Sequence, residues 1–342
     1  MGLGVRRLLP LLAILAAFLA LAQPPTDRAA QAVRAWLSGK YRVNPMEAVG
    51  RPPEEAFKLL ERSLAFPPPP PGLEVNLKEP ELERRGPETW VRFPAVAGGE
   101  SGEVVVRLKD GRVVGVAWRP QGGLLPAWLL RPWAGPVFVL LGFLLLLSLV
   151  RGRLRPYWRE ALRLVAERRR LFWATQAGLF ATFFLGALAA YADPRVARLL
   201  GELLGTGIGQ IGLEKAVRNG PLGLAAVIFY WNFTRGLLLT TALPGVFFGV
   251  PALLVNLARY YVLGMALSPA VIPPERFLLH LPVVLLELGA YNTATFGGLA
   301  LLGDLLAGRG FSAGLRTLGR SLVLATALLF LAAVYEAFEV LA

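Results

Sequence analysis

Long apolar runs, each interrupted by a few polar residues, dominate the C-terminal part of the chain. The run over residues 277–302 is long enough to span a bilayer, which takes about 20 mostly apolar residues. It nevertheless contains His280 and Glu287, which share one helical face with Val284 and Tyr291. The pattern therefore predicts a membrane-spanning helix with a single polar face.

Glu287 stands ten residues inside this run, roughly 15 Å along a helix and therefore near the middle of a bilayer. A carboxylate at that depth is costly and faces the interior of the bundle or a wet cavity. Two interpretations stay open. Glu287 is either a structural group that is hydrogen-bonded to a neighbouring helix, or a group that serves transport or proton transfer.

The same pattern predicts about six mature transmembrane helices. They cover residues 134–150, 171–191, 277–302 and 321–342, with two crossings inside 221–272. The last five form a bundle over residues 171–342. Residues 192–219 mix charges of both signs with glycines, which favours an external loop with a short interfacial helix. The predicted fold class is mainly α, a polytopic α-helical membrane bundle with a small exported α+β domain.

Arginines set the expected orientation of the bundle. Residues 151–170 contain eight arginines against two glutamates, and the polar loop over residues 303–320 contains three more arginines. Because basic residues mark the cytoplasmic side, both segments are predicted to be cytoplasmic. The first reads as an amphipathic helix with an apolar stripe of Trp158, Leu162 and Val165. We expect it to lie on anionic inner-leaflet lipid, and docking of a cytoplasmic partner is the alternative.

The amino terminus resembles an export signal. Two arginines precede an apolar run over residues 8–21, and a small-residue cleavage signal ends at Ala22. This pattern predicts a signal peptide over residues 1–22, with an uncleaved anchor as the alternative. In either case residues 23–133 are expected to be exported.

Residues 23–133 have the alternation of a small α+β domain. Two helices are predicted, over 26–38 and 53–65, and three strands, over 89–93, 103–108 and 112–118. Asp110 and Gly111 form a strong hairpin signal between the last two strands. The prolines of 67–71 predict a stiff spacer, or else a ligand for a proline-binding partner domain.

Composition narrows the range of functions. The chain has 342 residues, 55% of them hydrophobic, and a net charge of +13. Because the arginines cluster beside apolar runs, this charge does not indicate nucleic-acid binding. There is no cysteine, and with one histidine only carboxylates remain as metal ligands. Glu336 and Glu339 lie one turn apart but lack a second polar group at a defined cleft. We therefore expect no enzyme activity, no catalytic residue, no cofactor and no metal.

Other polar residues interrupt the apolar runs. Amides, prolines and glycines within 221–272 predict discontinuous or closely packed helices. Arg235 needs a partner in a membrane, and Glu287 or Glu336 is expected, although Arg235 could instead extend to the outer interface. The predicted intramembrane polar cluster comprises Asn232, Arg235, Asn256, His280, Glu287, Tyr291, Asn292 and Glu336.

Several short motifs carry a family resemblance. They are FYWNFTRG, PGVFFG, NLARYYVLG, LLELGAYNTATFGG and LAAVYEAF, which contain Asn232, Asn256, Glu287 and Glu336. Over about residues 171–342 the chain resembles the stage II sporulation protein M family of integral membrane proteins. The family usually has a His-Gly pair one turn before the middle-span glutamate, where this chain has Val283 and Val284.

The resemblance implies a membrane scaffold that holds peptidoglycan-degrading partners during engulfment. We therefore predict a non-enzymatic integral protein of the plasma (inner) membrane that anchors or recruits a cell-envelope partner. The alternative is a permease or channel-like transporter that uses Glu287. Assembly into a homo-oligomer is left open.

Overall fold

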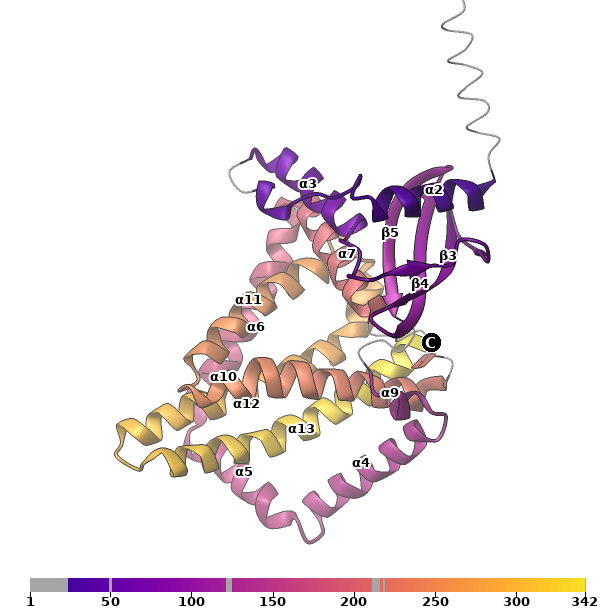
Figure 1. Ribbon diagram of the computed structural model, residues 1–342. Coiled ribbons are helices and arrows are strands. Elements are labelled where there is room, and N and C mark those ends of the chain that lie inside the picture. Colours follow the sequence, from indigo (N-terminus) through magenta and orange to yellow (C-terminus); the bar gives the residue numbers. More distant parts are fainter. Residues whose placement is uncertain (1–23, 49–50, 121–124, 211–215, 218, 342) are drawn as a thin grey trace, which may run out of the picture. The chain divides into compact units, whose positions relative to one another are not determined.

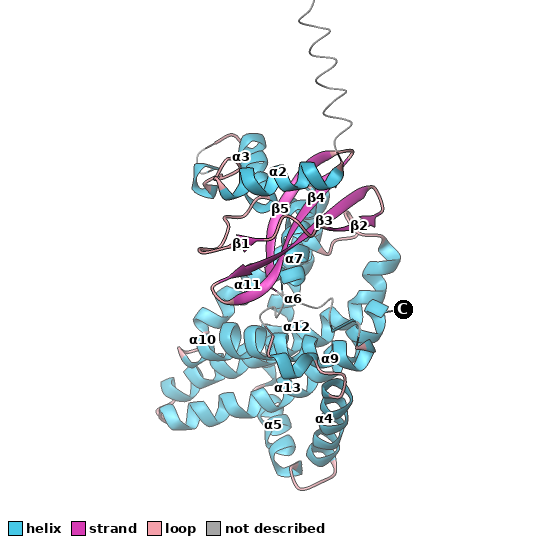
Figure 2. Ribbon diagram, turned by 45° about the vertical axis from the view of Figure 1, so that its right-hand side comes forward, coloured by secondary structure: helices cyan, strands magenta, loops and turns pink. Residues whose placement is uncertain are grey.

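The computed structural model describes residues 24–48, 51–120, 125–210, 216–217 and 219–341 (Figure 1). The predicted signal peptide lies outside the described residues. The chain divides into two compact units, Met1–Gly123 and Leu124–Ala342. The first is built on an antiparallel sheet and the second on helices (Figure 2). The fold is therefore mainly helical with a small sheet, as the sequence predicts.

Five antiparallel strands form the sheet of the first unit. They are β1 Glu74–Val75, β2 Glu81–Arg85, β3 Glu88–Ala97, β4 Glu100–Lys109 and β5 Arg112–Pro120. The order is β1-β3-β4-β5, and β2 also pairs with β3. The last three are the strands that the sequence predicts, whereas β1 and the charged β2 have little apolar pattern and were missed. Asp110 and Gly111 both have positive φ, as their hairpin turn requires.

Helix α2 (Pro25–Leu37) covers one face of this sheet, and α3 (Pro53–Ala65) follows the short helix η1 (Pro45–Ala48). Both α2 and α3 match predicted helices. Val33 and Trp36 of α2 pack with Phe93 and Val104 of the sheet, and all four are buried. The indole of Trp36 donates a hydrogen bond of 2.6 Å to the carbonyl of Pro67, which ties the start of the proline segment to this core.

The second unit consists of helices. They are η2 Ala127–Leu130, α4 Ala134–Val150, α5 Arg155–Glu167, α6 Arg169–Ala192, α7 Pro194–Gln210, α9 Gly220–Trp231, η3 Asn232–Ala242, α10 Leu243–Val246, α11 Val250–Ala266, α12 Pro274–Leu306 and α13 Phe311–Leu341. Among the described residues, four helical stretches are long and apolar enough to cross a membrane: α6, α9 to α10, α12 and α13. Helices α4 and α5 together form a fifth candidate that is bent by 69°. Helix α11 is apolar but shorter, so the predicted count of about six spans stays a prediction.

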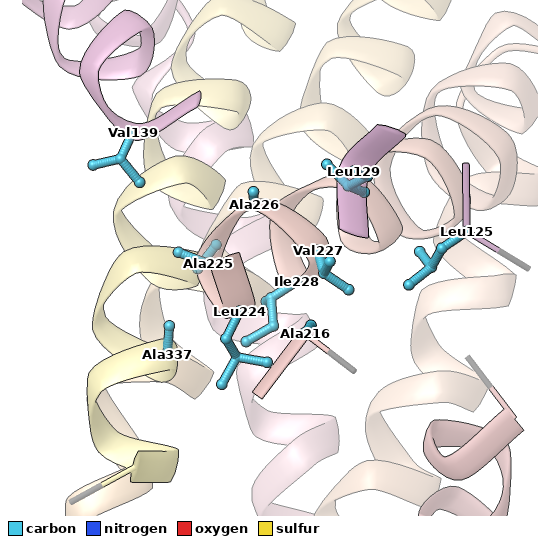
Figure 3. Close-up of a cluster of buried hydrophobic side chains, with 11 residues drawn as sticks. Leu125, Leu129, Val139, Ala216, Leu224, Ala225, Ala226, Val227, Ile228 and Ala337 are labelled. Carbon is cyan, nitrogen blue, oxygen red and sulfur yellow. The ribbon is translucent and has the colours of Figure 1, made fainter. Parts of the chain in front are cut away.

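A cluster of buried apolar side chains joins η2, α4, α9 and α13 (Figure 3). Leu125 and Leu129 belong to this cluster, together with Val139 and Ala337. The second unit therefore begins before residue 133, which the sequence suggested as the end of the exported domain.

The segment from α9 to α11 is broken, as predicted. It contains an 11-residue π-helix, η3, and then breaks at Phe248 and Gly249, which have positive φ. A Cβ on Gly249 would overlap the backbone of Gly298 and Leu299 in α12. Glycine is therefore required at this position by both its conformation and the close approach of α12.

Helices α12 and α13 run side by side and form a hairpin (Figures 1 and 2). Only residues 307–310 separate them, and Gly308 and Gly310 there have positive φ. The predicted polar loop over 303–320 is therefore wrong. Its polar residues Asp304 and Thr317 are hydrogen-bonded to each other within the hairpin, so both helices extend past them.

Candidate functional site

The polar face of α12 centres on Glu287 and Tyr291. The Tyr291 hydroxyl donates a hydrogen bond of 2.9 Å to Oε1 of Glu287, and the tyrosine is 2% exposed. The two residues lie on one helical face, as the spacing predicts, and they are hydrogen-bonded as an i, i+4 pair. Glu287 is half-buried and bonded within its own helix.

Arg259 of α11 is the cation of this site, and it was not among the predicted cluster residues. Its guanidinium carbon lies 5.0 Å from the centre of the Tyr291 ring. It also donates a hydrogen bond to the hydroxyl of Thr240 in η3, while Nη1 is buried without a hydrogen-bond partner among the described residues. Arg259 thus joins α11, η3 and α12 around one tyrosine.

The π-helix η3 makes room for that tyrosine. A Cβ on Gly236 would overlap the hydroxyl and ring of Tyr291. Thr240 and Thr241 both donate hydrogen bonds to the carbonyl of Gly236, at 2.8 and 2.9 Å. π-Helical segments are rare and are often found at functional sites. Here the segment brings a backbone without a side chain against Tyr291.

Arg235 does not belong to this site. It is exposed, stacks on Trp231 of α9 at 5.6 Å, and forms no ion pair with a described carboxylate. The predicted pairing with Glu287 or Glu336 is therefore wrong. Because the neighbouring Gly236 faces Tyr291, Arg235 points elsewhere. Asn232 is half-buried, and its side chain forms no hydrogen bond within the described part of the chain.

Neutral side chains form a polar layer between the helices. Asn256 of α11 donates to Thr295 of α12 at 2.9 Å and to Thr241 of η3 at 3.3 Å. Asn292 of α12 donates to Gln176 of α6 at 2.8 Å. All except Gln176 are fully buried, and Gln176 is 8% exposed. The two asparagines were predicted, whereas their partners carried no distinctive sequence signal.

His280 and the glutamates near the end of α13 form a separate contact. His280 Nδ1 lies 2.9 Å from Oε2 of Glu339, so the histidine pairs with α13 rather than with Glu287. The hydroxyl of Tyr335 donates to the carbonyl of Leu279 at 3.1 Å. Oε2 of Glu336 is buried and has no hydrogen-bond partner among the described residues. These contacts fix α12 against α13.

A charged cluster that the sequence did not reveal lies at the α12–α13 turn. Asp304 is 2% exposed and accepts hydrogen bonds from Arg309 at 3.0 Å, from Thr317 at 2.7 Å, and from Arg168. Arg168 also donates to the carbonyl of Ala300 at 2.6 Å. Since Arg168 stands between α5 and α6, the cluster fastens that junction to the hairpin.

The chemistry available to these groups is limited. Within the described residues, no group of three or more histidine, cysteine, aspartate or glutamate side chains could hold a metal ion. The groups instead link helices to one another. In the group formed by Glu287, Tyr291 and Arg259, a carboxyl could take up a proton beside a phenol and a cation.

Comparisons with known proteins identify the region that contains these groups. No curated protein and no solved structure matches the chain. The family model described as stage II sporulation protein M matches residues 176–339, from Gln176 in α6 to Glu339 in α13. The match contains all eight predicted cluster residues and confirms the resemblance seen in the sequence motifs. Over this stretch, which is most of its helical unit, the chain is similar to the stage II sporulation protein M family.

Proposed function

We propose that this protein is a non-enzymatic scaffold of the plasma (inner) membrane, in which the helical unit is the anchor and the sheet unit recruits a cell-envelope partner. The observation that supports this proposal best is the pairing of buried polar groups across helices. Asn256 bonds to Thr295, and Asn292 bonds to Gln176, so these amides serve contacts between helices. Such contacts suit a scaffold whose helices keep fixed positions relative to one another.

The energetics of a membrane interior support the same proposal. Hydrogen bonds between helices in a bilayer contribute on average about 0.6 kcal/mol each. Glycines add close packing: a Cβ on Gly186 or Gly264 would overlap backbone atoms across the α6–α11 contact. Many small contributions of this kind hold helices in one arrangement, which is what an anchor for a partner requires.

The proposed topology places the sheet unit outside, and α5 and the α12–α13 turn in the cytoplasm. The chain has no cysteine, so a single introduced cysteine can show on which side of the membrane its segment lies. Ser38 and Ser312 are both exposed, and serine to cysteine is a small change. A membrane-impermeant maleimide should label Ser38→Cys in intact cells and label Ser312→Cys only after permeabilisation. The reverse pattern would overturn the topology.

Recruitment is tested with the full chain in its own membrane. A photo-crosslinking residue placed at exposed positions of the sheet unit, such as Arg42 and Arg84, should capture an envelope protein. The matched control carries the same probe at Leu254, an exposed position of the apolar helix α11. If no sheet-unit position captures an envelope protein above that control, the recruiting role is wrong.

A permease is the second candidate, and the Glu287 site favours it. Tyr291 donates a hydrogen bond to this carboxyl, Arg259 lies over the Tyr291 ring, and the buried Oε2 of Glu336 has no hydrogen-bond partner among the described residues. The test is ion and proton flux in proteoliposomes with Glu287→Gln, which keeps the shape and removes the charge. Exposed Glu275 on the same helix supplies the control Glu275→Gln. Flux that Glu287→Gln abolishes and Glu275→Gln retains would support transport. If the wild-type protein gives no flux, the permease proposal is wrong and the scaffold proposal stands.

A further inference from the structure

Helix α5 has two sides with different environments. Ala161 and Leu164 are buried, at 0% and 5% exposure, and Leu164 packs with Phe296 and Ala300 of α12. Leu162 is 47% exposed, although the sequence places it in the same stripe as the half-buried Val165. One side of α5 is therefore covered by the bundle, and the opposite side is free of it.

The arginines of residues 151–170 divide in the same way. Arg168 turns inward to Asp304 and to the carbonyl of Ala300. The other seven are exposed: Arg151, Arg153, Arg155, Arg159, Arg163, Arg169 and Arg170. Of the two acids in the segment, Glu160 is paired with Arg320 at 3.0 Å. The exposed charge of the segment is therefore strongly positive.

Helical spacing places part of this charge on one face. Arg155, Arg159 and Arg163 follow one another at i, i+4 and i+8, and Leu162 lies beside them. These four residues are named here the arginine face of α5. Ala161 and Leu164 lie on the other side of the same helix. The bundle therefore holds α5 in a rotation that leaves the arginine face open.

The position of α5 between two apolar helices determines how deep the arginine face lies relative to the membrane. Helix α5 starts five residues after the apolar helix α4 ends at Val150, and α6 starts two residues after α5 ends. Short connections to two apolar helices keep α5 close to the level at which they leave a bilayer. Arginines at this level reach phosphate groups while their methylene stems lie along apolar surface.

We propose that the arginine face of α5 binds the headgroups of anionic phospholipids, with Leu162 entering the acyl boundary between the arginines. The seven exposed positive charges complement a negatively charged leaflet, and the single exposed leucine suits a helix that lies at a membrane surface. Because Ala161 and Leu164 hold α5 on the bundle, the helix binds lipid without leaving the protein. The lipid thereby becomes a stabilising ligand of the helical unit.

The first experiment measures stabilisation of the purified full chain by phosphatidylglycerol, which is added to neutral detergent and phosphatidylcholine micelles. Each basic residue near an anionic surface strengthens binding about fivefold, so Arg155→Gln, Arg159→Gln and Arg163→Gln together should raise the phosphatidylglycerol concentration for half-maximal stabilisation roughly a hundredfold. The control replaces exposed arginines of the sheet unit, Arg34, Arg42 and Arg112, with glutamine and should leave this concentration unchanged.

Two further conditions distinguish a lipid headgroup from free phosphate as the bound anion. Inorganic phosphate at the same concentration should give no stabilisation, and high salt should weaken the phosphatidylglycerol effect by screening. Both triple variants should unfold at the wild-type temperature in phosphatidylcholine alone, which separates lipid binding from folding. The proposal is overturned if the α5 variant keeps the wild-type response to phosphatidylglycerol, or if phosphate alone reproduces that response.

The second experiment places a nitroxide label on α5 in vesicles that contain phosphatidylglycerol. Leu162→Cys should be labelled and should show contact with a lipid-soluble relaxation agent. Ala161→Cys, one residue away and 0% exposed, should resist labelling in the folded protein. Equal labelling at both positions, or a label at position 162 that senses only the aqueous agent, would contradict the proposed face.

Discussion

The middle and the C-terminal end of α12 hold buried polar groups in different ways. In the middle, Asn292 and Thr295 are fully buried and bond to neutral partners. At the end, Asp304 is 2% exposed and pairs with two arginines. An ion is costly to bury unless it is paired and hydrogen-bonded. The helix thus uses amides and hydroxyls at its centre, and ions where it reaches the turn.

This difference predicts that the charged end is the more sensitive to substitution. Asp304→Ala leaves Arg168 half-buried without its carboxylate and should lower the free energy of unfolding by about 3 kcal/mol or more. The measurement is unfolding by SDS in mixed micelles. The exposed pair Glu160 and Arg320 provides the control, and Glu160→Gln should change this free energy by about 1 kcal/mol at most. Equal effects of the two substitutions would remove the distinction between a buried and an exposed ion pair.

The next largest effect is expected at Gly236, where η3 touches Tyr291. A methyl group on Gly236 overlaps the tyrosine ring, so Gly236→Ala should lower the free energy of unfolding by about 1–3 kcal/mol. Gly319 of α13 has open space around its Cβ position, so Gly319→Ala should be neutral or stabilising by up to about 1 kcal/mol. The same SDS titration compares them. A neutral Gly236→Ala would show that Tyr291 moves aside easily.

The sequence located the elements better than it located their partners. Apolar runs predicted α12 and α13, and amides inside such runs marked Asn256 and Asn292. Asp304 stands at the end of a run, where a charged residue resembles an ordinary loop residue. Its burial depends on Arg168, which is far away in the sequence. No local pattern carries that information.

Arg235 and Arg259 also show that a local sequence pattern does not identify the partner of a polar residue. Each is a single arginine in an apolar stretch, so they carry equal sequence signals. The rotation of a helix decides which of them meets Tyr291, and η3 is a π-helix, whose phase differs from that of an α-helix. The α-helical spacing that correctly placed Glu287 and Tyr291 on one face therefore could not decide between the two arginines.

The smallest effects are expected in the neutral layer at the middle of α12. Asn256→Ala removes the hydrogen bond to Thr295 and should lower the free energy of unfolding by about 1–2 kcal/mol, of which the hydrogen bond itself supplies about 0.6 kcal/mol.

A double-mutant cycle with Thr295→Val isolates that hydrogen bond from the cavity that Asn256→Ala leaves. The coupling energy should lie near 0.6 kcal/mol and below 2 kcal/mol, well under the loss caused by Asp304→Ala. A coupling energy as large as the Asp304 effect would mean that neutral and ionic contacts along α12 stabilise the helix equally. The contrast between its middle and its end would then reflect only which residue types occur there, with no difference in how strongly each is held.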